Sequence, residues 1–288
     1  MIKMNEEIIK KSLKYYHIKN KDYTQKCMSC LEKLEQNPKL KEKVIELKNK
    51  MLEDDHFLKK IWNFHDLDEM LDESSLPFLT NIILLSTYDI VKKNTHNFSR
   101  IQIKLAKKRI RESLLNDILK RGYKSIRLSQ MLWGIYFVKG RIIEIGKLQY
   151  EISFVNPMTE TEEKVIKIHI PKGKSLNIKE VNQYLKKASK KIKKYFHLNS
   201  PNYYCNSWLL SKEILKLLDK DANIVKFSKL FTIKEGEECT SDILNFVFEI
   251  NECKNYNDLS QNTSLQKKIK TNLIEGTTFH LGIGLLKK

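Results

Sequence analysis

Two residues in the second half of the chain, His169 and Glu151, could take up a proton from a substrate. Histidine titrates near neutral pH without help, whereas a glutamate needs burial to raise its pKa into that range. His169 closes a strand-like segment directly before a turn that begins at Pro171. Each residue also has an ordinary interpretation, as a structural histidine and as a half-exposed strand residue. We predict that one of the two is a general base.

Three further residues lie on strand-like segments and could take part in chemistry. Ser207 and Cys205 alternate along one segment, and either could donate a proton to a leaving group; a buried cysteine, however, usually serves as a small apolar residue. A Cys205 nucleophile activated by His169 is a further alternative. His280 shares a strand face with glycines 282 and 284, where a missing side chain lets a ligand approach the backbone. Tight strand packing is the alternative there. We include Ser207 and His280 among the catalytic candidates.

The turn after His169 could bind an anion. Lys172, Gly173, Lys174 and Ser175 lie between a strand-like segment and a helix that begins near Asn177. Backbone N–H groups at a helix N-terminus attract phosphate, and two lysines add positive charge. The string is not a nucleotide-binding P-loop, because Ile168 occupies the place of its first glycine. An ordinary Pro/Gly turn with solvated lysines is the alternative.

No set of residues has convincing metal-ligand spacing, and we predict no metal. Cys27 and Cys30 form a single C-x-x-C pair without a second pair at zinc spacing. A local cluster of acids and histidines is better explained as a solvated loop or helix face. The cluster comprises His56, His65, Asp66, Asp68, Glu69, Asp72 and Glu73.

The composition limits the kinds of partner that the chain can bind. The formal charge of the chain is +18, and nearly all of its 53 basic residues are lysines. The charge therefore favours polyanionic partners. Arginine, however, binds phosphates and the edges of bases better than lysine does, because its guanidinium group forms two parallel hydrogen bonds. Lysines cover the polar side of one helix, which could bind nucleic acid, an anionic membrane or a phosphorylated ligand, or could simply be solvated; they are Lys186, Lys187, Lys190, Lys191, Lys193 and Lys194. The sequence shows no secretory signal and no apolar stretch long enough to span a bilayer, and its five cysteines are scattered and odd in number. We therefore expect a cytoplasmic protein without a membrane partner.

The elements that must position these residues divide into two halves. Residues 1–121 are predicted to be a helical domain, with helical spacing of apolar residues near 8–16, 40–47, 79–91 and 101–121. Gly122 is predicted to end the last of these helices. Residues 122–288 are predicted to be a second domain that contains a sheet.

The second half predicts a mixed sheet with helices on its faces, and so an α+β fold overall. Apolar and alternating runs predict strands at 131–138, 141–154, 164–170, 203–209, 243–250 and 277–286. Within 141–154 the alternating apolar residues lie at odd-numbered positions directly before residue 146 and at even-numbered positions after residue 147. A strand alternates with a period of two, so this change predicts a break at Gly146-Lys147. Helices are predicted at 177–195, 211–218, 224–231 and 265–273, and Asn177 with Glu180 resembles a capping box.

This order of elements resembles the GNAT N-acyltransferase fold, and several strings resemble two-domain acyltransferases with a helical N-terminal domain and a GNAT-like C-terminal domain. The resemblance covers residues 122–288 well, and the N-terminal half matches mainly in length and helicity. The strings are GKLQYE (146–151), IHIP (168–171), CNSWLL (205–210), NIVKF (223–227) and HLGIG (280–284). Asn206 departs from the family pattern, which often has histidine there, and Lys147 stands where arginine is common.

The resemblance implies an acyltransferase that moves an acyl group from acyl-CoA, acetyl-CoA or an acyl carrier to an amine of a small molecule or peptide. It also implies that the pyrophosphate of CoA binds the loop of residues 171–177. Two other functions stay open. One is a GNAT-shaped protein that binds a ligand or partner without catalysis. The other is nucleic-acid binding; scarce arginine and the lack of an RRM, KH or helix-turn-helix signature count against it. The oligomeric state is not predicted.

Overall fold

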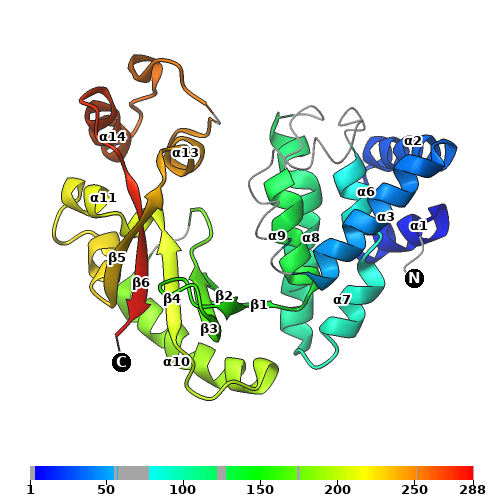
Figure 1. The fold of residues 1–288 in the computed structure, drawn as a ribbon, viewed down its shortest axis with the longest axis horizontal. Coiled ribbons are helices and arrows are strands. Elements are labelled where there is room, and N and C mark those ends of the chain that lie inside the picture. Colours follow the sequence, from blue (N-terminus) through cyan, green and yellow to red (C-terminus); the bar gives the residue numbers. More distant parts are fainter. Residues whose placement is uncertain are drawn as a thin grey trace. The chain divides into compact units, whose positions relative to one another are not determined.

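The computed structural model describes residues 4–54, 57, 78–121, 128–173, 176–250 and 252–287 (Figure 1). The chain forms two compact units, Met1–Ile142 and Ile143–Lys288. The predicted domain limit at residues 121–122 falls at the edge of a stretch outside the described residues. None of the helices in the described ranges combines the length and hydropathy that a bilayer span requires.

The first unit is helical, as predicted. Its described helices are α1 (Glu6–Tyr15), α2 (Lys21–Gln36), α3 (Pro38–Glu53), α6 (Leu79–Leu85), α7 (Tyr88–Asn94), α8 (Arg100–Arg121) and α9 (Leu128–Val138). The first three begin at asparagines 5, 20 and 37, whose side chains each accept a hydrogen bond from the backbone N–H three residues later. This capping satisfies amide groups that have no partner within the helix.

Two predictions for the first unit are wrong in detail. The helix expected over residues 79–91 is divided into α6 and α7, because the hydroxyls of Ser86 and Thr87 donate to the carbonyls of Ile83 and Leu84 and compete with the helical pattern. The strand expected over 131–138 is part of helix α9. A short, wholly apolar run does not distinguish a buried strand from a buried helix. Gly122, the predicted stop signal, lies outside the described residues.

The second unit contains one mixed sheet, as predicted. Its strands are β1 (Ile142–Ile145), β2 (Leu148–Val155), β3 (Glu162–His169), β4 (Tyr203–Ser207), β5 (Phe231–Glu238) and β6 (His280–Leu286). The spatial order is β1-β2-β3-β4-β6-β5, and Figure 1 shows β6 between β4 and β5. Strands β3 and β4 are parallel, whereas β2–β3, β4–β6 and β5–β6 are antiparallel. The predicted break is confirmed, since Gly146 turns the chain from β1 into β2 with a φ of 63°.

The helices of the second unit connect these strands. They are α10 (Ile178–Phe196), α11 (Lys212–Leu217), α12 (Asn223–Ser228), α13 (Thr240–Ile243) and α14 (Ser264–Ile274), with short 3₁₀ turns η2 (Trp208–Leu210) and η4 (Tyr256–Asp258) and a π-helical turn η3 (Leu244–Phe248). Helix α10 packs on the sheet through Tyr184, which lies against Gly146, and through a hydrogen bond of Ser189 with Tyr203.

The strand expected over 243–250 is wrong, and β5 was not predicted. Residues 240–248 form α13 and η3 instead, with Ile243 and Leu244 buried. Strand β5 lies at the edge of the sheet and carries exposed charges such as Lys234 and Glu237, so it lacks an apolar alternation. Edge strands are commonly charged in this way, because the charges discourage pairing with other chains.

Candidate active site

Strands β3 and β4 part after a short parallel ladder. Their described cross-strand partners are Ile166↔Tyr203 and Lys167↔Tyr204, and the ladder ends there. Strand β3 continues to His169 beside β2, and β4 continues to Ser207 beside β6. Two strands that separate in this way present main-chain donors and acceptors along the facing edges, which suits an extended ligand that contains amides.

His169 and Glu151 meet at the end of β3. The Nε2 atom of His169 lies 2.7 Å from Oε2 of Glu151. In the antiparallel ladder Gln149 faces His169 and Glu151 faces Lys167, so the two residues are diagonal neighbours on one face of the sheet. The side chain of Glu151 is 8% exposed and that of His169 is 27% exposed. A carboxylate in this position fixes the orientation of the imidazole ring.

The polar row extends to a pair that the sequence analysis missed. The amide of Gln149 donates to Oε2 of Glu144 at 3.1 Å, and both residues are buried. Polar residues within an apolar strand sequence were the available signal, because a buried polar group needs a partner. Glu144, Gln149, Glu151 and His169 therefore lie on neighbouring strands β1, β2 and β3.

Ser207 and Cys205 lie on the other face of the sheet from His169. Tyr204 is the ladder partner of Lys167, which shares the face of His169, so the alternate residues 203, 205 and 207 point away from it. The hydroxyl of Ser207 accepts a hydrogen bond from the backbone N–H of Leu209 at 3.2 Å and caps η2. Asn206, by contrast, is exposed and shares the face of His169.

Cys205 is unsuited to nucleophilic chemistry. Its side chain is buried, and burial raises the pKa of the thiol to about 12, so the thiolate is scarce at neutral pH.

We expect a thiol-specific reagent such as a maleimide to modify Cys253 fastest in the native protein, because the other four cysteines are buried. Peptide mapping by mass spectrometry after a short exposure measures this order. Modification of Cys205 at the rate of Cys253 would show that the interior of the sheet is open to solutes.

The turn after β3 is described only in part. Lys172 forms an ion pair with Glu249, and its side chain is 51% exposed. Gly173 has a φ of 74°, a conformation that favours glycine. Lys174 and Ser175, the other two predicted anion-binding residues, lie outside the described residues.

Asn177 caps α10 by accepting from the N–H groups of Lys179 and Glu180, as expected. The Glu180 side chain, however, binds Lys147 at 2.7 Å.

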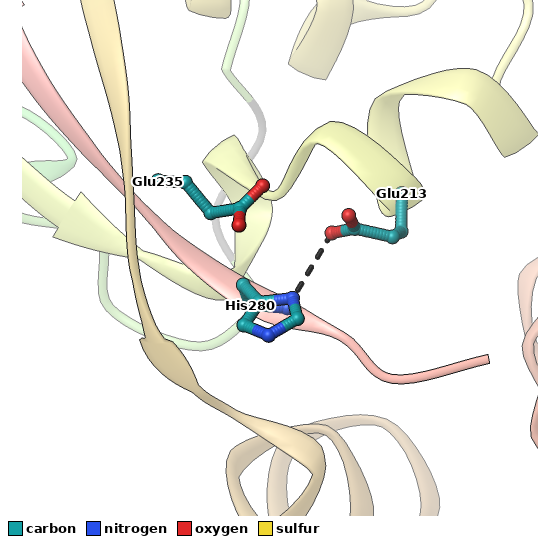
Figure 2. A group of neighbouring side chains, drawn as sticks. All are labelled: Glu213, Glu235 and His280. Atoms are coloured by element: carbon teal, nitrogen blue, oxygen red, sulfur yellow. Dashed lines mark hydrogen bonds between the residues drawn. The ribbon is translucent and has the colours of Figure 1, made fainter.

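His280 belongs to a second cluster, with Glu213 of α11 and Glu235 of β5 (Figure 2). One potential metal-binding atom of each residue lies within 4.8 Å of those of the other two. The absent side chains of the glycines beside His280 make room for neighbouring residues of the protein. A Cβ atom on Gly282 would lie 2.2 Å from the carbonyl oxygen of Leu210, and one on Gly284 would lie 2.9 Å from Phe231. Tight packing therefore explains both glycines.

Comparisons with known proteins concern the family and the fold of this chain. The model of the GNAT-like C-terminal domain family matches residues 142–286. A solved acyltransferase mutant in complex with octanoyl-CoA is 16% identical, with a TM-score of 0.74 over 100% of this chain and 89% of that chain. An acyltransferase in complex with decanoyl-CoA and teicoplanin is also 16% identical, with a TM-score of 0.73 over the same shares.

A third solved acyltransferase, in complex with decanoyl-CoA, is 21% identical, with a TM-score of 0.63 over 76% of this chain and 67% of that chain. A search of curated protein sequences finds no match. At these identities the solved structures establish a shared fold, which includes the helical region before the sheet.

Proposed function

Since this chain belongs to the family of the GNAT-like C-terminal domain, we propose that it is an N-acyltransferase that uses acyl-CoA. The observation that carries the proposal is the separation of β3 and β4 beside the His169–Glu151 pair. The parted edges offer main-chain partners for the two amides of the pantetheine arm of CoA. We propose that the thioester lies near the ends of the two strands.

His169 is the proposed general base, and Glu151 is its positioning partner. A proton held at Nε2 by Glu151 makes Nδ1 the basic nitrogen of the ring. The acceptor amine attacks the thioester carbonyl carbon and passes a proton to His169. Collapse of the tetrahedral intermediate breaks the C–S bond, and the proton returns to the CoA thiolate. We assign stabilisation of the oxyanion to main-chain N–H groups of the parted strands.

Ser207 and His280 have no place in this mechanism. The Ser207 side chain lies on the opposite face and caps η2. His280 lies with Glu213 and Glu235 in the second cluster. Asn206, which stands where the family pattern often has histidine, shares the face of His169, and we propose that His169 supplies the base from the neighbouring strand.

The donor and acceptor classes follow from the same proposal. The similar structures hold octanoyl-CoA or decanoyl-CoA, so medium-chain acyl-CoA is the first donor to test. One of them also holds teicoplanin, which makes an amine-bearing small molecule the first acceptor class to test. Release of CoA from octanoyl-CoA, measured with a thiol reagent across a panel of such amines, tests the function. Binding of octanoyl-CoA without CoA release would favour a non-catalytic binding protein.

We propose that Lys172 contacts the phosphates of CoA, because it lies at the start of the loop between β3 and α10. Replacement of Lys172 by alanine is expected to weaken octanoyl-CoA binding by up to about fivefold, as for an exposed charge pair. Glu249→Gln is expected to strengthen binding, since it releases Lys172 from its ion pair. Calorimetry measures both constants.

Lys220→Ala is the matched control, because Lys220 is an exposed lysine on another loop. Equal affinities for the wild type, Lys172→Ala and Lys220→Ala would place the phosphates elsewhere.

A further inference from the structure

Three metal-binding side chains converge from separate elements of the second unit. Glu213 comes from α11, Glu235 from β5 and His280 from β6, and Figure 2 shows both carboxylates beside the imidazole. The potential ligand atoms all lie within 4.8 Å of one another. Two carboxylates so close together repel each other unless a positive charge lies between them.

The imidazole of His280 has a buried nitrogen, Nδ1, that makes no hydrogen bond with the described residues. Buried polar atoms are nearly always paired, so an exception indicates a missing water, ion or ligand. This observation is independent of the proximity of the two carboxylates.

Glu213 is already held in position. Its Oε2 atom accepts a hydrogen bond from the Ser211 hydroxyl at 2.7 Å and another from the peptide N–H of His280 at 3.4 Å. Outer-shell hydrogen bonds of this kind orient the side chains of metal sites.

Glu235 is exposed, and its carboxylate makes no hydrogen bond or ion pair with the part of the chain that the structure describes. It lines a surface cavity together with Leu281 and Gly282. The side chain is therefore accessible from solvent and able to move by the small distance that coordination requires. Bonds of about 2.0–2.2 Å to one ion bring ligand atoms to roughly 3–4 Å from each other.

We propose that Glu213, Glu235 and His280 bind one divalent transition-metal ion, of the class represented by Zn²⁺. One nitrogen and two carboxylate oxygens suit such an ion, whereas Mg²⁺ and Ca²⁺ prefer sites made wholly of oxygen. Two carboxylate ligands balance the charge of the ion. Three protein ligands leave a position for water on the side of the cavity. The ion would join the edge strand β5 to β6 and α11, and its binding does not depend on acyl transfer.

Zinc titration of chelator-treated full-length protein tests the site. We expect one Zn²⁺ per chain by calorimetry, confirmed by elemental analysis after dialysis, and a higher melting temperature with Zn²⁺. Glu235→Gln and His280→Gln are each expected to weaken this binding at least tenfold and to remove the thermal shift. Mg²⁺ at the same concentrations is expected to produce neither effect.

Glu237→Gln is the matched control, because Glu237 is an exposed glutamate on the same strand. The experiment is run in a Cys253→Ser background, which removes the most accessible thiol as a competing ligand. If His280→Gln does not fold, the exposed Glu235 still provides the test. Absence of zinc binding, equal binding by Glu235→Gln and Glu237→Gln, or equal affinity for Mg²⁺ would each overturn the proposal.

Discussion

Replacement of His169 by glutamine is expected to lower the kcat of acyl transfer by about 10²–10⁴-fold, the range typical for loss of a general base. Glutamine keeps a polar side chain of similar length but cannot take up a proton from the amine. Octanoyl-CoA affinity should change little, because the proposed contacts of the donor are main-chain groups and Lys172 and do not include His169. The measurement is CoA release at saturating octanoyl-CoA with the best amine acceptor found.

Glu151→Gln separates a positioning role from a catalytic one. Its carboxylate touches the imidazole and not the reacting atoms, so the loss in kcat should be smaller than for His169→Gln. The pH profile of kcat should also differ between the two variants. In His169→Gln the part of the profile that depends on the base should disappear, because glutamine cannot exchange a proton.

His96→Gln is the matched control for both variants, since His96 is an exposed histidine of the first unit. A His169→Gln enzyme with full kcat and an unchanged pH profile would refute the assignment of the base. In that case His169 and Glu151 form a structural pair.

The sheet could be predicted where the sequence alternates clearly. Apolar residues of β2, β3 and β6 alternate with polar ones, and the change of parity located the turn at Gly146. Strand β5 could not be found, because its charges reflect an edge position that only the three-dimensional order reveals. The strand prediction for residues 131–138 of helix α9 is wrong because these residues are almost all apolar, so they show neither a helical nor a strand period.

The candidate site was predictable by residue type but not by arrangement. Glu151 and His169 were both candidate bases, yet their contact depends on the register of β2 against β3, which pairs Gln149 with His169. A shift of one residue would move one partner to the other face. The register of β4 against β3 likewise explains why Ser207, which the sequence analysis grouped with His169 as a catalytic candidate, lies on the other face of the sheet.

Gly282→Ala is expected to have the largest effect on stability, with a loss of about 3 kcal/mol or more in the free energy of unfolding, because overpacking against backbone cannot be relieved by a rotamer change. The added methyl group would lie 2.2 Å from the carbonyl oxygen of Leu210 and 2.5 Å from its carbonyl carbon. The variant must therefore displace η2 from β6 or bend β6. Denaturant unfolding followed by circular dichroism measures the change.

Gly236→Ala is the matched control on the neighbouring strand β5. Its added methyl group would lie 3.2 Å from side-chain atoms of Ile283, which can adjust, and 3.3 Å from the carbonyl oxygen of Leu281. Both distances are much longer than those at Gly282, so the loss should be about 1 kcal/mol. Similar unfolding free energies for the two variants would show that η2 does not pack tightly on β6.

The comparison of the two glycine variants also bears on the proposed CoA site, because η2 follows Ser207 and joins β4 to α11. If η2 is displaced in Gly282→Ala, the end of β4 loses its support, and octanoyl-CoA binding should weaken in that variant but not in Gly236→Ala.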